Sequence, residues 1–118
     1  MDLAEARCAV LAAKEHTALP VFATMTYEAG GRTFLGCDVR AMGLVLEGGG
    51  ADAIGINCSL GPDQMLPVMQ ALAESTSRPL ILKLNAGLPD PQTGAYRLSP
   101  EGYGTVLEPY LDLGGACR

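Results

Sequence analysis

An adjacent asparagine and cysteine, Asn57 and Cys58, come directly after an apolar run at residues 51–56. Turn residues, Gly61 and Pro62, follow them. In parallel α/β folds the carboxyl ends of the strands and the loops after them form the active-site face. A thiol placed there can attack a substrate or bind a metal ion. The alternative is a structural pair, in which Cys58 is a small buried apolar side chain and Asn57 an amide that ends a strand.

Three short runs rich in β-branched, aromatic and aliphatic residues have the pattern of buried strands. Each is followed by a loop and then by a stretch with helical character. Asp38 and Ser99 are the expected N-caps of two helices. Pro67 is expected in the first turn of its helix, and Pro109 is expected to weaken or kink the last one. The strands are expected at residues 21–27, 51–57 and 79–84, and the helices at residues 3–15, 38–47, 64–75 and from 99 onward.

The strand starts recur at roughly the 30-residue length of one βα unit. Strands without polar alternation, each followed by a helix, predict a parallel sheet covered by helices. This periodicity does not distinguish a doubly wound sheet from a (β/α)8 barrel. Since no linker divides the chain, residues 1–118 are expected to form one α/β unit, cut at both ends.

The composition narrows the class of protein. The net charge is −5 and the eight Lys and Arg residues are scattered, which argues against nucleic-acid binding. The first residues alternate charged and apolar side chains, unlike a signal peptide, and no apolar run is long enough to cross a membrane. Four cysteines at irregular spacing, without a secretion signal, indicate reduced thiols and a cytoplasmic protein.

The remaining cysteines and the single histidine are interpreted as structural. Cys8 lies among alanines of the first helix, so core packing is expected. Cys37 precedes a helix start, where the helix dipole is expected to lower its pKa. His16 follows a helix end and is interpreted as a solvated cap.

Four segments together resemble the homocysteine-binding module of the cobalamin-dependent methionine synthase family. The segment at residues 51–62, which contains the Asn57-Cys58 pair, looks like the family's strand that delivers its first zinc cysteine. Residues 19–27 resemble the preceding strand, and residues 83–89 resemble the following one, although Leu84 stands where the family usually has proline. Residues 2–7 are similar to the helix before all three.

The resemblance implies a partial (β/α)8 TIM barrel, from about helix 4 to the start of strand 8, because a complete barrel needs roughly 250 residues. It implies that Cys58 is one ligand of a catalytic zinc ion and that a Gly-Gly-Cys-Cys pair after the eighth strand supplies the other two. Here Gly114-Gly115 is followed by Ala116-Cys117-Arg118. In register, Cys117 would open the eighth strand and precede that pair, so it is not expected to be a ligand.

The resemblance also implies the substrate and its contacts. Homocysteine would bind the zinc ion through its sulfur as a thiolate, and Asn85, Ala86 and Gly87 would contact its amino-acid part. Asn57 is expected either to hydrogen-bond the substrate or to orient the metal-binding loop. Thr24 and Thr26 are expected to point toward the same rim of the barrel.

In the family, the methyl group comes from methylcobalamin, and separate domains bind the folate and the cobalamin. The expected partners of this chain are therefore the remaining barrel strands and those domains. With Cys58 as its only zinc cysteine, the chain by itself is expected to be inactive. The alternative is a non-catalytic half-barrel that needs a partner chain and binds no metal, because an open edge of parallel strands makes a poor isolated fold.

Overall fold

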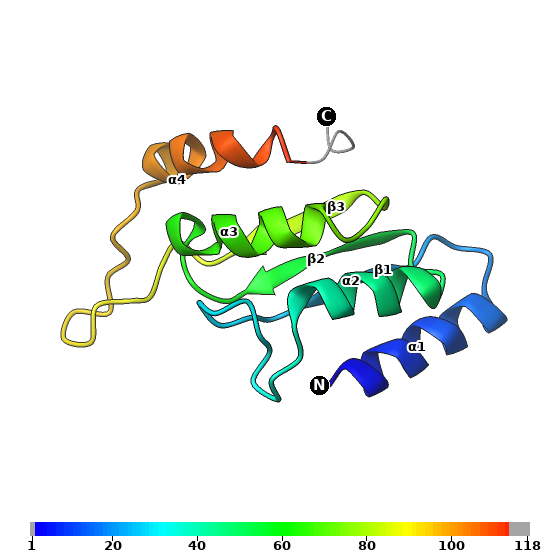
Figure 1. Cartoon of the computed structure of the whole chain (residues 1–118). Coiled ribbons are helices and arrows are strands. Elements are labelled where there is room, and N and C mark those ends of the chain that lie inside the picture. Colours follow the sequence, from blue (N-terminus) through cyan, green and yellow to red (C-terminus); the bar gives the residue numbers. More distant parts are fainter. Residues whose placement is uncertain (1, 114–118) are drawn as a thin grey trace.

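The computed structural model describes residues 2–113 and contains one three-stranded parallel sheet (Figure 1). Its strands lie in the order β1-β2-β3, and Thr24, Gly55 and Ile81 are aligned across it. The bounds are β1 (Phe22–Met25), β2 (Ala53–Cys58) and β3 (Leu80–Leu84). The prediction of a parallel α/β sheet is confirmed. β2 begins two residues later than predicted and includes Cys58 as its last residue.

Helices connect the strands and continue beyond the third one. Asp2 caps α1 through a capping box with Glu5, Asp38 caps α2, and Ser99 caps α4, which confirms the two predicted caps. The α-helical part of α4 ends before Pro109, where a 3-10 turn takes over, as expected. The bounds are α1 (Leu3–His16), α2 (Val39–Gly48), α3 (Pro62–Ala73), α4 (Pro100–Leu107) and η1 (Glu108–Tyr110).

The start of α3 differs from the prediction. The helix begins at Pro62, not at Gln64, because proline fits the first helical position and Gly61 leaves the preceding backbone extended. Pro67 consequently lies inside the helix and not in its first turn. It lacks the N–H that would bond the carbonyl of Asp63, so this helix lacks one internal hydrogen bond.

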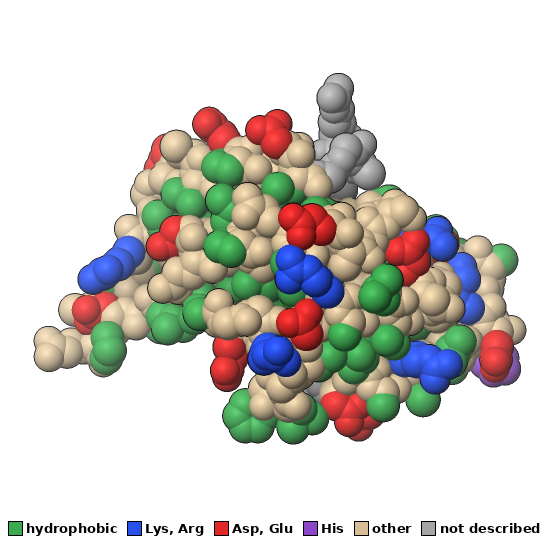
Figure 2. Space-filling view, in the orientation of Figure 1, with side chains coloured by type: hydrophobic (Ala, Val, Ile, Leu, Met, Phe, Trp, Pro, Cys, Tyr) green, Lys and Arg blue, Asp and Glu red, His purple; other side chains and the backbone are tan. Residues whose placement is uncertain are grey.

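One face of the sheet is packed against the helices and the other is open. Ile54 and Ile56 of β2 are fully buried in a core that also contains residues of α1, α2 and α3. The intervening residues of each strand point to the opposite face, where Phe22 is 67% exposed and Lys83 is exposed. On the outside of the molecule, acidic and basic side chains are interspersed (Figure 2). The largest fully buried side chains are Tyr27, Met42, Leu46, Ile54, Ile56, Met65, Leu72 and Pro62.

Polar contacts join the elements at the amino ends of the strands. The Asp52 carboxylate accepts hydrogen bonds from the Val21 N–H at 2.8 Å and from Lys14 Nζ at 2.9 Å. The Val21 N–H, with Lys14 second, lowers the pKa of Asp52. This contact fixes α1 and β1 against the start of β2, at the end of the sheet opposite to Cys58.

The close approach of β2 and β3 requires glycine at position 55. A Cβ atom on Gly55 would lie 1.9 Å from the carbonyl oxygen of Ile81, which is far inside van der Waals contact. The two nearest atoms, the carbonyl oxygen and carbon of Ile81, belong to the backbone of β3, so they cannot rotate away. Within residues 2–113, no helix is long and apolar enough to span a membrane.

We predict that Gly55→Ala lowers the free energy of unfolding by about 2–3 kcal/mol or more, because the added methyl group forces β2 and β3 apart. Urea denaturation of both proteins would measure the loss. Gly104→Ala, in α4, is the matched control, since no atom lies within 4 Å of a Cβ there. It should be neutral or stabilise by up to about 1 kcal/mol. Equal stabilities of the Gly55 variant and the parent would contradict the packing described.

Candidate active-site rim

The carboxyl ends of the three strands meet at one edge of the sheet. Cys58, the last residue of β2, is aligned with Leu84, the last residue of β3, and β1 ends beside them at Met25. Cys58 is exposed and is not enclosed by the helix layer. The thiol is therefore placed where side chains from neighbouring strands and loops converge.

Cys58 and Ser59 form a left-handed turn. Their φ angles are 55° and 66°, and they are the two non-glycine residues with positive φ in the described part of the chain. Such a conformation costs about 1–2 kcal/mol per residue. Strict strand alternation would direct Cys58 toward the helices with Ile54 and Ile56, and the left-handed turn ends that alternation. Backbone strain of this kind clusters at functional sites.

Hydrogen bonds from all three strand ends hold this turn. Ser59 Oγ accepts from the Tyr27 N–H at 2.9 Å and donates to the Asn57 carbonyl at 3.2 Å. Asn85 Nδ2 donates to the Ser59 carbonyl at 3.0 Å, and the Asn85 N–H bonds the Cys58 carbonyl at 3.4 Å. At about 1 kcal/mol each, these bonds offset the cost of the turn.

The sulfur of Cys58 has a polar neighbour from its own strand. Asn57 Nδ2 donates to Cys58 Sγ at 3.4 Å. By alternation with the buried Ile56, Asn57 belongs to the open face of the sheet. The contact restrains the sulfur of Cys58, and the role of Asn57 toward a metal-binding loop or a substrate stays a prediction.

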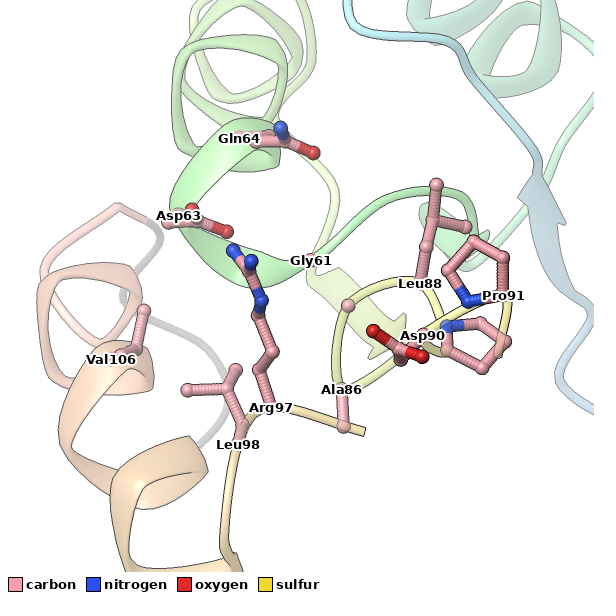
Figure 3. A pocket seen from close by; sticks show the side chains of 12 residues that line it. Gly61, Asp63, Gln64, Ala86, Leu88, Asp90, Pro91, Arg97, Leu98 and Val106 are labelled. Carbon is pink, nitrogen blue, oxygen red and sulfur yellow. The ribbon is translucent and has the colours of Figure 1, made fainter. Parts of the chain in front are cut away.

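Two hollows flank the turn and divide the predicted substrate residues between them. The first, the loop hollow, has a volume of about 460 Å³ and includes Ala86 and Gly87 (Figure 3). In it the Arg97 side chain extends toward the start of α3, near Asp63. The lining residues are Gly61, Asp63, Gln64, Ala86, Gly87, Leu88, Pro89, Asp90, Pro91, Arg97, Leu98 and Val106.

The second hollow, the rim hollow, lies on the side of β1 and has a volume of about 340 Å³. Asn57, Thr24 and Thr26 line it, so these predicted rim residues are grouped together. The lining residues are Thr24, Met25, Thr26, Tyr27, Glu28, Thr33, Phe34 and Asn57. Asn57 thus lines a different hollow from Ala86 and Gly87. Asn85 lines neither of the two hollows, and its side chain is bonded to the Ser59 carbonyl in the turn that separates them.

A family model and known relatives identify the family of this chain. The family model for homocysteine S-methyltransferase matches residues 1–118. The chain belongs to the homocysteine S-methyltransferase family. It is 32% identical to methionine synthase of Mycobacterium tuberculosis (strain ATCC 25618 / H37Rv) over 128 aligned residues and 31% identical to that of Mycobacterium leprae (strain TN). Each alignment covers 98% of this chain and 11% of the relative, so the chain spans about a tenth of the length of these curated relatives.

For a member of the homocysteine S-methyltransferase family, metal-binding side chains are expected at the rim. Among residues 2–113, no group of three or more His, Cys, Asp or Glu side chains is arranged to hold a metal ion. Cys58 is thus the one predicted metal ligand among the described residues, which contain no complete metal site. Cys117 lies outside them.

Sequence reasoning missed two residues of the rim. Ser59 follows the cysteine directly, but nothing in a lone serine signals that it bonds two other strand ends. Tyr27 is 1% exposed, and its hydroxyl has no hydrogen-bond partner within the described chain. Burial, and then the nearby Cys37 and Asp38, raise the pKa of Tyr27 well above its ordinary value.

Two predictions about the other cysteines are wrong. Burial, and then the neighbouring Asp38, raise the pKa of Cys37, and these effects outweigh the lowering by Arg32. Cys8 is exposed on α1 and does not pack in the core, which that helix enters through Ala6 and Val10.

We predict that Ser59→Ala destabilises the chain by about 1–3 kcal/mol, because it leaves the Tyr27 N–H without its acceptor. Hydrogen exchange of the Tyr27 amide should accelerate in the same variant. Ser77→Ala is the control: Ser77 is exposed, and Glu47 there still accepts hydrogen bonds from Thr76 Oγ1 and from the backbone N–H of residue 77. That change should cost about 0.5 kcal/mol or less. An unchanged Tyr27 exchange rate would refute the role of Ser59.

Proposed function

We propose that this chain is the later portion of a homocysteine-binding (β/α)8 barrel, from about helix 4 to the start of strand 8. Its activity in the complete barrel is the transfer of a methyl group to homocysteine in methionine synthesis. The family match over residues 1–118 supports the reaction class, and the two methionine synthases support the type. The open face of the sheet, with Phe22 exposed, is the face that the missing strands would enclose.

One observation carries this proposal: Cys58 is exposed at the carboxyl end of the central strand. A cysteine that served packing would be buried among apolar neighbours. This one instead ends a strand in a strained turn and receives a hydrogen bond from Asn57. A sulfur held in this way is available to a metal ion at the rim.

The chemistry explains why sulfur ligands suit this acceptor. Homocysteine attacks a methyl group as a thiolate, yet a free thiol with a pKa of about 8.5 is mostly protonated at neutral pH. Zinc held at this rim would supply the missing acidity, because the thiolate form of a thiol is favoured when the thiol is bound to zinc. We assign Cys58 as one ligand and the family's cysteine pair, beyond Arg118, as the other two. With Cys58 alone the chain would hold zinc too weakly to be active.

The residues around Cys58 orient its sulfur and are assigned to bind the substrate. Asn57 fixes the sulfur, and Ser59 and Asn85 fix the turn that carries it. We assign Asn57, Asn85, Ala86 and Gly87 to the substrate, with Ala86 and Gly87 acting through their backbone groups. Since one N–H of Asn85 Nδ2 is bonded to Ser59, its carbonyl oxygen and its second N–H remain available to homocysteine.

The methyl donor is assigned outside this chain. Methylcobalamin, like the folate, would be bound by other domains of a cytoplasmic parent enzyme. A non-catalytic half-barrel that pairs with a second chain and binds no metal is the alternative. The two readings differ in whether Cys58 binds zinc once the remaining cysteines are supplied.

We predict that the chain alone binds zinc at well below one ion per molecule, whereas a version extended through the cysteine pair binds about one, because three sulfur donors are then present. Elemental analysis after dialysis would measure both ratios. Equal stoichiometric zinc in the two proteins would contradict the assignment and would favour Cys117 as a ligand. Zinc absent from both would favour the non-catalytic half-barrel.

In a protein extended to the complete barrel and the domains that bind the methyl donor, Cys58→Ser should abolish stoichiometric zinc and reduce methyl transfer to homocysteine by at least about a hundredfold, since a ligand is lost. Cys8→Ser is the matched control, because Cys8 is exposed on α1. It should leave both quantities unchanged. Methyl transfer that survives the loss of Cys58 would exclude it as a zinc ligand.

A further inference from the structure

Tyr103 of α4 binds the end of β3 through its hydroxyl group. The hydroxyl donates a hydrogen bond to the Leu84 carbonyl at 2.8 Å, and the side chain is half-buried. Leu84 is the last residue of β3 and is aligned with Cys58. The helix that follows β3 therefore contacts that strand at the level of the candidate metal ligand.

The carbonyl that Tyr103 binds points to the free edge of the sheet. The N–H and C=O of a trans peptide group point to opposite sides. In the peptide group between Leu84 and Asn85, the N–H donates to the Cys58 carbonyl, so the C=O faces away from β2. β3 is the edge strand on that side of the described sheet. The hydroxyl thus supplies a partner to a carbonyl that no strand within residues 2–113 pairs with.

This peptide group connects α4 to the turn that carries Cys58. On one side it accepts from Tyr103, and on the other it donates to the Cys58 carbonyl at 3.4 Å. Asn85 adds a side-chain bond to the Ser59 carbonyl, and Ser59 Oγ accepts from the Tyr27 N–H. Hydrogen bonds therefore run in series from α4 across the rim to the segment after β1, and bonds in such a series strengthen one another.

Tyr110 of η1 makes a chemically similar bond outside this series. Its hydroxyl donates to the carbonyl of Pro62, at the start of α3, and its side chain is also half-buried. Since α4 and η1 both contact α3, the two tyrosines share the role of fixing this part of the chain. They differ in that Tyr103 alone binds a peptide group that is bonded to the Cys58 carbonyl.

We propose that Tyr103 is a positioning residue that holds the Cys58 turn at the rim through the peptide group between Leu84 and Asn85. The inference rests on the proposed function, which makes Cys58 a zinc ligand, although the contacts themselves involve no metal. Residues that support a metal ligand typically contribute about ten- to a hundredfold to metal affinity. Because Tyr103 acts through a peptide group, its contribution is expected at the lower end of that range.

Amide hydrogen exchange of the full chain tests this coupling without any metal. In Tyr103→Phe, which removes only the hydroxyl, the Asn85 amide should exchange about fivefold faster, as for one lost hydrogen bond. The Tyr27 amide, at the far end of the series, should accelerate about twofold or more, as for groups in one hydrogen-bond network. A tyrosine that only fixed α4 on β3 would leave the Tyr27 amide unchanged. Each rate is divided by that of the Ile54 amide, which bonds the Pro79 carbonyl at the opposite end of the same strands, to remove any change in global stability.

Tyr110→Phe is the matched control and should alter neither rate. In Ser59→Ala, where the Tyr27 amide has already lost its acceptor, Tyr103→Phe should have no further effect on that amide. In a version extended through the cysteine pair, Tyr103→Phe should lower the zinc affinity about tenfold, and Tyr110→Phe should leave it unchanged. If Tyr103→Phe keeps the parent's exchange rate at Tyr27, or if Tyr110→Phe raises that rate equally, the assignment of Tyr103 is wrong. Absence of zinc from the extended parent would instead overturn the zinc proposal, and the exchange rates would still decide whether Tyr103 holds the turn.

Discussion

The rim depends on one strained turn and on the contacts that hold it. Cys58 and Ser59 adopt left-handed backbone conformations that neither residue type favours. The turn persists because Ser59 is bonded to Tyr27, two residues after β1, and to Asn85, the residue after β3, so that three strand ends share one hydrogen-bonded group. A change at any of the three ends therefore moves the sulfur of Cys58. Packing beneath the turn gives it a rigid base, since Ile54 and Ile56 are fully buried.

The sheet has two unlike faces, and this asymmetry determines what the chain can do. The helices cover the face that carries Ile54 and Ile56, while Asn57, Thr24 and Lys83 belong to the other. In a closed barrel the second face would become the interior, and its polar residues would be concentrated near the rim. Gly55 lets β2 and β3 approach closely in the middle of that face. The polar residues of this face and Gly55 would therefore suit the interior of a barrel completed by further strands.

Much of the fold could be predicted because local signals agreed with the packing. The apolar run at residues 80–84 predicts β3. The capping residues Asp38 and Ser99 predict the starts of α2 and α4. The start of α3 differs from the prediction because Gly61 caps the helix without a side-chain hydrogen bond, and Pro62 at the first helical position also fits the predicted turn. Cys37 was misjudged because its pKa depends on burial and on Asp38, which become known only with the fold.

The candidate site was predictable in part, for a physical reason. A cysteine at the end of an apolar strand can be located from sequence, since strand ends of a parallel sheet share one edge. The role of Ser59 depends on contacts with Tyr27 and Asn85, which are 32 and 26 positions away in the sequence. Likewise, nothing in the sequence of Ala86 and Gly87 reveals that they line a different hollow from Asn57.

Protection of Cys58 from alkylation by zinc tests the central claim most directly. In a chain extended through the family's cysteine pair, the rate of iodoacetamide modification would be followed at each cysteine with and without zinc. We expect zinc to slow the modification of Cys58 severalfold or more and to leave that of Cys8 unchanged, since both thiols are exposed but only one lies at the rim. Equal rates at Cys58 with and without bound zinc would show that its sulfur is not a ligand, and the account of this rim as a metal-dependent methyltransferase site would be wrong.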